Sequence, residues 1–405
     1  MMDSRLMSDE LATGVVSQDD AADAVIYARR LLMVVALLCC FGLTMLYSTS
    51  YNAAGAEYFR KQLMWIVAGG AGAFAVFVIG YRRIASWSTV WLVLSIVLLL
   101  LALKFKAING ANRWIRIGGF SIQPSEFAKI AMAIYTARYV SDNLRTFGDL
   151  MRKRGGLIEF GLVAGLLLGC IILGRDLGTT TLVATMVFVT LLAGGLRLRY
   201  LIIPVALASL VATYIWFFDK MRMGRVTSFM EPETYAKTTG YQLYNSLLAL
   251  GSGNWFGIGF MESRLKARYL PEAHTDFILS IVGEELGLVV LALLVVCYGI
   301  FTWYALKISV SANSRLGMLL GFALTAGISL QAVINIAVIS GAAPTKGMPA
   351  PFISYGGSNL MAGLLAIGLL LSIAAETAHP GYNEEYLSAI RRKLPFLFRN
   401  RNKHH

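Results

Sequence analysis

Charged side chains are scarce in this chain of 405 residues. Asp, Glu, Lys and Arg together make up 15% of it, whereas about a quarter of an average soluble domain is charged. Apolar residues make up 57% and come in blocks, such as 31–46 and 90–103. Such blocks approach the roughly 20 residues that cross a bilayer. The sequence therefore excludes a soluble enzyme and a disordered chain, and it lacks the short alternating segments of an outer-membrane barrel.

Cysteine and histidine are equally rare, with four residues of each. They do not have the spacing of zinc ligands, and the chain contains neither a Walker loop nor a dinucleotide fingerprint. These absences argue against a zinc site and an ATP-driven pump. The cysteines lie inside apolar blocks, which predicts small buried side chains rather than the disulfides of a secreted scaffold. They are Cys39, Cys40, Cys170 and Cys297.

What the chain does contain is ten apolar segments long enough to predict membrane-spanning helices. The predicted fold is an all-α polytopic membrane protein, with a membrane domain over residues 29–378. The acidic residues 1–28 predict a disordered cytoplasmic tail, and residues 379–405 predict a basic cytoplasmic tail. The ten segments are 31–50, 62–80, 88–104, 124–140, 157–174, 178–195, 200–218, 277–305, 316–340 and 358–377.

Basic residues outnumber acidic ones by 36 to 23. In a soluble protein this excess would indicate nucleic-acid binding, but in a membrane protein Lys and Arg collect in cytoplasmic loops. With the N-terminus inside, the cytoplasmic segments carry 20 of the 36 basic residues and the short outer loops only 8. The sequence therefore predicts both termini in the cytoplasm and no nucleic-acid partner.

One large loop, 219–276, lies between the seventh and eighth predicted spans and outside the cytoplasm. Its apolar pieces, 241–251 and 255–260, are too short to span a bilayer. A long loop that is partly apolar is expected to be ordered and to lie on the membrane surface or dip into it.

Three polar clusters lie at the outer ends of predicted spans, where costly charges often mark functional sites. The first is Gln123–Lys129, in which Pro124 suits the first turn of a helix. Glu126 and Lys129 are three residues apart and can pair on one helix face. They predict either an internal ion pair that holds the helix in the bundle or a cation placed to hold an anionic head group.

The second cluster leads into the eighth predicted span at Asp276. Ser280, Gly283 and Gly287 follow on one helix face, so the carboxylate would stand above a strip of small residues that faces a cavity or a sideways opening to the membrane. The alternative is that Asp276 caps the helix, with the Glu284–Glu285 pair buried beside partners. The two roles of Asp276 are compatible.

The third cluster is Pro351–Ser358, which contains Ser354 and two glycines. The glycines predict a tight turn or a close backbone approach, so the segment either closes against the bundle or serves the site. In the ninth span, Gln331 and Asn335 predict hydrogen bonds between helices. Together the clusters fit either an enzyme that acts on a lipid substrate or a transporter.

At these motifs the chain resembles the SEDS family (shape, elongation, division and sporulation proteins) of bacterial peptidoglycan glycosyltransferases. The similarity runs from residue 30 to residue 377, and the chain looks more like the division member of the family than the elongation member. The motifs are Asn112-Arg113-Trp114-Ile115, Gln123–Lys129, Asp176–Thr179, Gly257-Ile258-Gly259, Tyr269–Phe277, Gly283–Gly287 and Pro351–Ser358.

The resemblance implies a ten-helix fold that polymerises lipid II, an undecaprenyl-pyrophosphate-linked disaccharide-pentapeptide, at the septum of the bacterial cytoplasmic (inner) membrane. It implies that Asp276 is essential to catalysis and that Lys129 lies in the central cavity. Arg60 or Lys61 matches a basic residue of that cavity. The implied partners are a divisional class B penicillin-binding transpeptidase of the FtsI type and other membrane proteins of the division machinery.

The chemistry of such a reaction gives the candidates their roles. A sugar hydroxyl must lose its proton during attack, which predicts Asp276 as the general base. The pyrophosphate leaving group gathers negative charge and needs cations, supplied by Lys129 with Arg60 or Lys61, and a divalent Mg or Mn ion would suit the same task. No organic cofactor is expected. The remaining candidates, as metal ligands, orienting groups or substrate-binding groups, are Glu126, Glu272 and Ser354.

Inversion from an α-linked donor to a β-linked polymer takes one displacement and one base, unlike the carboxylate pair of most glycosidases. Two other functions stay open. A lipid II flippase fits the polytopic fold, but it would carry cation sites reachable from both faces and often inverted repeats, and no repeat is visible in the sequence. A scaffold that recruits division proteins through its tails does not explain the Asp276 region.

Overall fold

The computed structural model describes residues 18–106, 111–117, 120–143, 156–197, 200, 220–268, 270–271, 273–384, 386 and 388. In these residues nine helices coincide with nine of the ten predicted spans. The predicted span 200–218 lies outside the described residues except for Tyr200. The nine helices are α2 (Gln18–Ala54), α3 (Glu57–Ile79), α5 (Ser88–Ala102), α6 (Pro124–Asp142), α7 (Leu157–Leu173), α8 (Leu177–Ala193), α13 (Ile278–Val310), α14 (Arg315–Ile339) and α15 (Gly357–Ala378).

Length and composition mark most of these helices as membrane spans. Five of the described helices, α2, α3, α13, α14 and α15, are long and apolar enough to cross a bilayer, and α5, α7 and α8 are apolar but shorter. The all-α polytopic class is therefore confirmed. α6 carries Glu126, Lys129, Arg138 and Asp142, which explains its place inside the bundle rather than against lipid.

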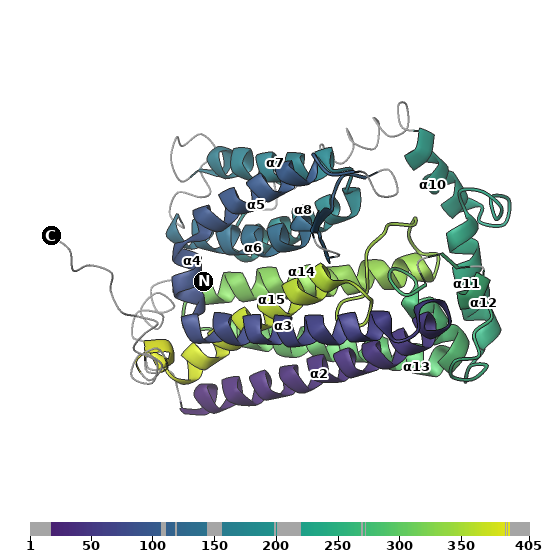
Figure 1. Cartoon of the computed structure of the whole chain (residues 1–405). Coiled ribbons are helices and arrows are strands. Elements are labelled where there is room, and N and C mark those ends of the chain that lie inside the picture. The colour runs from purple at the N-terminus through teal and green to yellow at the C-terminus, as the bar shows by residue number, and fades with distance from the viewer. Residues whose placement is uncertain are drawn as a thin grey trace.

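The helices form one bundle with two sides (Figure 1). α5, α6, α7 and α8 lie on one side, and α2, α3, α13, α14 and α15 lie on the other. α6 packs against α5, α8 and α14. Its buried face is rich in alanine, including Ala128, Ala131 and Ala137. Small residues let neighbouring helices approach closely where no hydrophobic effect drives them together.

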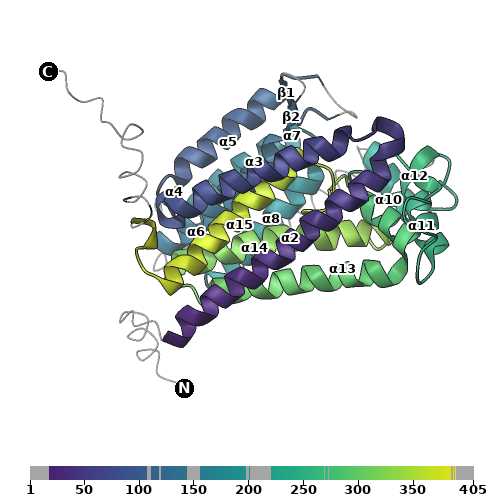
Figure 2. The ribbon, with the colours of Figure 1, turned by 60° about the horizontal axis from the view of Figure 1, so that its bottom comes forward.

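The short elements are gathered mainly at one end of the bundle. α10 (Lys220–Met230), α11 (Tyr241–Gly253) and α12 (Leu265–Arg268) lie where α2 ends and α13 begins. The start of α2 and the end of α15 lie at the opposite end (Figure 2), next to α4 (Tyr81–Ser86).

A small hairpin in the predicted loop 104–123 was not expected from the sequence. β1 (Ile115–Ile117) pairs antiparallel with β2 (Phe120–Ile122), with Ile115 opposite Ile122. The hairpin leads directly into α6 and so fixes the entry of the Gln123–Lys129 motif. Because strands of three residues carry little periodicity, pattern reading does not detect them.

Two sequence predictions need correction. α2 begins at Gln18, so residues 18–28 belong to the first helix and not to a disordered tail 1–28. An acidic side chain near the start of a helix favours the helix dipole, and the Tyr27 hydroxyl donates to Asp23 Oδ2 at 2.9 Å. The cysteines were predicted to be buried, but Cys40 is exposed on the outer face of α2.

The residues after α15 fold back onto the bundle. The Tyr382 hydroxyl donates to the Phe77 carbonyl oxygen at 2.6 Å and lies 2.8 Å from Ser372 Oγ. Burial raises the pKa of Tyr382 to about 12, so this hydroxyl stays protonated as a donor at neutral pH. The predicted tail 379–405 therefore begins with a packed segment.

Candidate active site

Asp276 stands at the head of α13, where α14 holds its backbone. The helix begins at Ile278 with Phe277 in the cap position, so Asp276 lies one residue outside the cap. The side-chain amide of Asn335 donates to the Asp276 carbonyl oxygen at 2.8 Å and to the Met348 carbonyl oxygen at 2.7 Å. One amide thus ties the Asp276 segment and the loop between α14 and α15 to the same point.

The carboxylate of Asp276 faces Gly347 and Arg113. A β-carbon built on Gly347 would lie 3.0 Å from Asp276 Oδ2 and 3.7 Å from Arg113 Nη2. The two side chains therefore meet around one glycine, although they come from distant parts of the chain. Arg113 Nε is buried with no hydrogen-bond partner among the described residues, so this guanidinium has a donor to spare.

Asp176 holds Arg113 from the other side. Its Oδ1 lies 3.6 Å from Arg113 Nη1, and the Asp176 side chain is 4% exposed. It also caps α8, accepting from the backbone N–H of Thr179 at 3.1 Å. Gln123 Nε2 and Ser125 Oγ donate to the same carboxylate at 2.9 and 3.0 Å. With this many donors, the charge of Asp176 is satisfied without Arg113.

Lys346 precedes Gly347 in the loop between α14 and α15, so its backbone lies next to this point. Burial lowers the pKa of Lys346 from the 10.5 of a free lysine. A partly desolvated ammonium gains more from an anionic ligand than a hydrated one does, because the local dielectric constant is lower. Asp276 and Arg113 thus face each other around Gly347, and Lys346 is the neighbour of that glycine in the chain.

Lys129 and Glu126 pair as one of the two sequence interpretations predicted. Lys129 Nζ lies 2.7 Å from Glu126 Oε2 and donates to Gln331 Oε1 at 2.7 Å. They line a pocket of about 40 Å³ together with Phe352 and Asn359. The ammonium is thus inside the bundle and already has two partners.

A hydrogen-bonded path joins this pocket to Asp276 through α14. Gln331 Nε2 donates to Asn359 Oδ1 at 2.9 Å and to the Pro349 carbonyl oxygen at 2.8 Å. Asn335, which holds Asp276, follows one turn later. The prediction of bonds between helices is confirmed for Gln331, which binds Lys129 of α6 and Asn359 of α15. Asn335 instead ties α14 to two loop segments.

Of the two basic residues predicted on α3, Lys61 lies closer to the site. Lys61 Nζ is 2.5 Å from Glu57 Oε1 in an exposed pair, and its charge acts on Tyr355, whose pKa burial raises. The Tyr355 N–H donates to the His274 carbonyl oxygen at 3.0 Å, two residues before Asp276. The Arg60 side chain is exposed.

Ser354 is buried in the loop that precedes α15. Its Oγ accepts from the Ala350 N–H at 2.8 Å, and its carbonyl oxygen accepts from Gln62 Nε2 at 3.0 Å. Nearby, Phe352 has a φ of 65°, a left-handed conformation that a bulky residue rarely adopts. The packing of this loop thus orders the wall of the pocket, and its role toward substrate stays a prediction.

The structure corrects the small-residue strip of α13. Ser280 is buried, and its Oγ lies 2.7 Å from Ser246 Oγ on α11. A β-carbon on Gly253 of α11 would lie 1.8 Å from the Gly283 carbonyl oxygen. α11 covers the strip, so this face of α13 is a packing surface and not a sideways opening.

Metal ligands are the least supported part of the site. Across the described residues, no three His, Cys, Asp or Glu side chains come close enough to hold a metal ion. Glu272, predicted as a ligand, lies outside the described residues. The donor set around Asp276 is instead rich in nitrogen cations, which suits an anionic ligand better than a metal.

The sequence reasoning did not select Arg113 or Lys346 as site residues. A signal for Arg113 was present, because the Asn112-Arg113-Trp114 run stands in an outer loop shortly before the Gln123–Lys129 motif. Lys346 was visible as the one basic residue of the outer loop 341–357. Neither signal shows that Arg113 meets Asp276 beside the residue that follows Lys346, which depends on the arrangement of α8, α13 and α14.

Comparison with known proteins agrees with this architecture. Residues 28–379 match a family described as cell cycle protein, the FtsW/RodA/SpoVE family. A probable peptidoglycan glycosyltransferase FtsW of Trichlorobacter lovleyi is 35% identical over 361 residues, 86% of this chain and 93% of that protein. Stage V sporulation protein E of Bacillus subtilis is 33% identical over 355 residues, 85% of this chain and 96% of that protein.

Two solved structures share the fold. A chain of a peptidoglycan synthase complex, described for its coordination of polymerization and crosslinking, matches with a TM-score of 0.72 at 25% identity, over 86% of this chain and 98% of that one. The rod shape determining protein RodA of Thermus thermophilus matches with a TM-score of 0.64 at 24% identity, over 86% and 96%. With the family match spanning most of the sequence, this chain belongs to the FtsW/RodA/SpoVE family of cell cycle proteins.

Proposed function

We propose that the protein is a peptidoglycan glycosyltransferase that polymerises lipid II by a single inverting displacement, with Asp276 as the general base. The observation that carries the proposal is the meeting of the Asp276 carboxylate and the Arg113 guanidinium around Gly347. A carboxylate that accepts a proton, beside a cation that holds a pyrophosphate, is the pair that this reaction needs. The name of the Trichlorobacter lovleyi relative, probable peptidoglycan glycosyltransferase, supports the same activity.

In this mechanism Asp276 accepts the proton of the acceptor's sugar hydroxyl while the hydroxyl oxygen attacks the anomeric carbon of the donor. A new glycosidic C–O bond forms as the C–O bond to pyrophosphate breaks. The lipid pyrophosphate leaves with the electron pair, and attack from the opposite face turns the α-linked donor into a β-linked polymer. Pyrophosphate is stable as an anion, so one base suffices.

The cations of the site have two different tasks in this proposal. Arg113, which faces Asp276, and Lys346 stabilise the charge that develops on the leaving pyrophosphate. Lys129 lies deeper, where Glu126 orients it and Gln331 ties it to α14, and it binds the head group of a substrate. On α3, the cation that attracts the approaching anionic substrate is Lys61 and not the exposed Arg60.

A divalent Mg or Mn ion would supply further charge to the pyrophosphate. Among the described residues no three His, Cys, Asp or Glu side chains gather around Asp276, which is a poor match to the oxygen-rich sites that such ions prefer. No step of the mechanism therefore depends on a metal ion. Ser354 and Glu272 stay candidates for contacts to the sugar or to a metal bound with it.

We further propose that the enzyme works at the division septum of the bacterial cytoplasmic membrane, with both termini in the cytoplasm. Its partner is a class B penicillin-binding transpeptidase, and other membrane proteins of the division machinery join them. Support comes from the FtsW relatives and from the similar chain found in a complex that couples polymerization to crosslinking. The excess of basic residues in the inner segments supports the orientation.

The decisive experiment is polymerisation of lipid II by the purified protein with its transpeptidase partner. We expect Asp276→Ala and Asp276→Asn to lower the rate by about 100- to 10,000-fold, the usual contribution of a general base. Asp142→Asn, which removes the charge of an exposed ion pair with Arg138, serves as the matched control and should keep full activity. Full activity in a folded, partner-bound Asp276 variant contradicts the assignment.

The same purified protein also tests the flippase alternative, through the movement of lipid II between leaflets. Reconstituted in vesicles, a flippase moves lipid II between leaflets and forms no polymer. If the wild type moves lipid II but makes no glycan with its partner present, the transporter function replaces the proposed one.

A further inference from the structure

α13 is built of two segments that meet at Gly287. This residue has φ 81° and ψ 176° inside the helix, a conformation for which glycine is suited. The upper segment, 278–286, carries Asp276 at its head, and the lower segment, 288–310, continues as a span. A break of this kind leaves backbone groups on both segments without helical partners, and such groups must be satisfied when buried.

Residues 254–259 supply the missing partners. They lie against the break as an irregular turn, donate to the upper segment and accept from the lower one. A β-carbon on Gly257 would lie 2.1 Å from the Glu285 carbonyl oxygen, so only glycine permits this approach. The four bonds are Ile258 N–H to Glu284 C=O (3.0 Å), Gly259 N–H to Glu285 C=O (3.1 Å), Leu288 N–H to Asn254 C=O (2.9 Å) and Val289 N–H to Trp255 C=O (3.2 Å).

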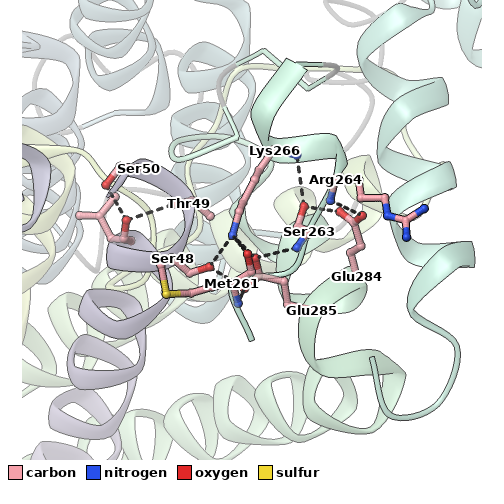
Figure 3. Close-up of polar contacts among 10 residues, drawn as sticks. Ser48, Thr49, Ser50, Met261, Ser263, Arg264, Lys266, Glu284 and Glu285 are labelled. Atoms are coloured by element: carbon pink, nitrogen blue, oxygen red, sulfur yellow. Dashed lines mark hydrogen bonds and ion pairs between the residues drawn. The ribbon is translucent and has the colours of Figure 1, made fainter. Parts of the chain in front are cut away.

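The side chain of Glu285 fastens the same loop to α2 (Figure 3). Lys266 Nζ lies 2.6 Å from Glu285 Oε1, and the side chains of this pair are 3% and 0% exposed. Ser48 Oγ of α2 donates to Glu285 Oε2 at 2.6 Å. The Met261 N–H donates to the same oxygen at 3.1 Å, so one buried carboxylate joins α13, α2 and the loop.

Glu284, the preceding residue, binds the loop a second time. Ser263 Oγ donates to Glu284 Oε2 at 2.5 Å, and the Arg264 N–H donates to Oε1 at 3.1 Å (Figure 3). Two neighbouring carboxylates of the upper segment thus both bind residues 261–266, and Glu285 binds Ser48 of α2 as well. The prediction that Glu284 and Glu285 are buried with partners is confirmed.

Stability alone does not account for this arrangement. A buried ion pair loses so much hydration that an apolar pair of similar size is often as stable. What it supplies is fixed geometry, because its hydrogen bonds are short and directional. The upper segment is separated from the membrane-spanning segment at Gly287, so its position depends on these bonds rather than on the rest of α13.

We propose that Glu284, Glu285 and Lys266 are positioning residues that set where Asp276 stands relative to Arg113. The upper segment behaves as one short rigid helix, and Asp276 lies about 13 Å from Glu285 along it at 1.5 Å per residue. A displacement of the Lys266–Glu285 pair would therefore also displace the Asp276 carboxylate. This inference rests on the proposed function, since its main readout is polymerisation.

The first test replaces Glu285 by Gln in the full protein with its transpeptidase partner. We expect kcat for lipid II polymerisation to fall roughly 10- to 100-fold, the cost of misplacing a reactive group by about 1 Å. KM should change little, because Arg113, Lys346 and Lys129 are untouched. Glu384→Gln, which removes the same charge from an exposed pair with Arg83, is the matched control and should leave kcat unchanged.

Glu285→Gln leaves Lys266 buried without its charge partner, which destabilises the fold as well as shifting the helix. A second variant is therefore needed to separate the two effects. The double variant Lys266→Met/Glu285→Met keeps the volume and removes both charges, so no unpaired charge stays buried. It leaves Ser48 and the Met261 N–H without their acceptor, so we expect it to fold with a moderately lowered Tm and still show the lowered kcat. A folded double variant with wild-type kcat and KM overturns the proposal.

A third measurement does not depend on activity or on any substitution. In the wild type, hydrogen exchange should find the amides of Leu288 and Val289 as protected as those of the neighbouring turns, because residues 254–255 accept from them. Fast exchange there overturns the inference. If the wild type itself makes no glycan while these amides are protected, the proposed function fails and the loop–helix contact stands.

Discussion

The Asp276 carboxylate packs closely against Gly347: a β-carbon there would lie 3.0 Å from the carboxylate oxygen Oδ2. Gly347 does not have a positive φ, so its backbone conformation is open to any residue. Glycine suits this position because of the space that Asp276 and Arg113 occupy. A methyl group at this position is thus a direct probe of whether the two side chains must stay where they are.

Gly347→Ala should lower the polymerisation rate without unfolding the protein. The added methyl must push the Asp276 carboxylate by a few tenths of an ångström, while Arg113 Nη2 at 3.7 Å stays in ordinary contact. Misplacing a reactive group by about 1 Å costs up to roughly 100-fold in rate, so we expect a loss smaller than that. The measurement is kcat with lipid II, together with Tm. Gly165→Ala is the control, since nothing lies within 4 Å of its β-carbon. Equal rates for the two variants would remove Asp276 from the reacting centre.

Arg113→Ala should lower kcat/KM by about 100- to 1000-fold, the range found when a group that stabilises transition-state charge is removed. Arg113→Lys should recover part of this loss because it keeps the charge. The fold should survive, because Asp176 retains its bonds from Thr179, Gln123 and Ser125. An Arg113→Ala enzyme with a normal Tm and normal kcat/KM would show that the leaving group is stabilised elsewhere.

The pH dependence of activity should depend on Lys346. Burial lowers its pKa below the usual 10.5, and only the protonated form attracts pyrophosphate, so activity should fall with rising pH from below 10.5. Lys346→Arg stays charged at these pH values, which should move the alkaline limb of the kcat/KM profile upward. Coincident alkaline limbs for wild type and variant would assign the limb to another group.

Stability should respond to Lys346 in the opposite sense. In the window between its lowered pKa and 10.5, the unfolded chain binds a proton that the folded chain lacks, so the free energy of unfolding rises with pH. Lys346→Met should abolish this contribution. Urea titrations of the two proteins across that window measure the difference.

Asn335→Leu should destabilise the protein by about 1 to 3 kcal/mol per buried carbonyl left unpaired, because the carbonyl oxygens of Asp276 and Met348 lose their shared donor. Thr136→Val is the informative comparison. Thr136 Oγ1 is buried and finds no hydrogen-bond partner in the described part of the chain, so an isosteric apolar replacement should be neutral or stabilising. Thermal unfolding of both variants tests this contrast, and equal Tm values would contradict it.

Most of the helices could be predicted from the sequence because a bilayer requires uninterrupted apolar length. α3, predicted over 62–80, is observed as Glu57–Ile79. The ion pair of Glu126 and Lys129 was also accessible, since residues three apart on a helix share a face. Such features depend only on local spacing, which is what a sequence displays directly.

Features that depend on distant segments were not accessible in the same way. Gly287 was interpreted as one of three small residues on a continuous helix face, whereas it breaks the helix, and the residues on either side of it bond to residues 254–259. Arg113 reaches Asp276 only because the hairpin, α8 and the loop before α15 converge. A single sequence gives the composition of those segments but not which of them meet.

The buried pair of Lys266 and Glu285 also has a consequence for the order of biosynthesis. Ser48 and Lys266 both precede Glu285 in the chain, so translation delivers them to the membrane first. When the segment with two adjacent glutamates is synthesised, the counter-ion and the loop that carries it have therefore already been made. The upper part of α13 can then form against partners that come earlier in the chain, and Glu285 does not have to wait for a later segment to neutralise its charge.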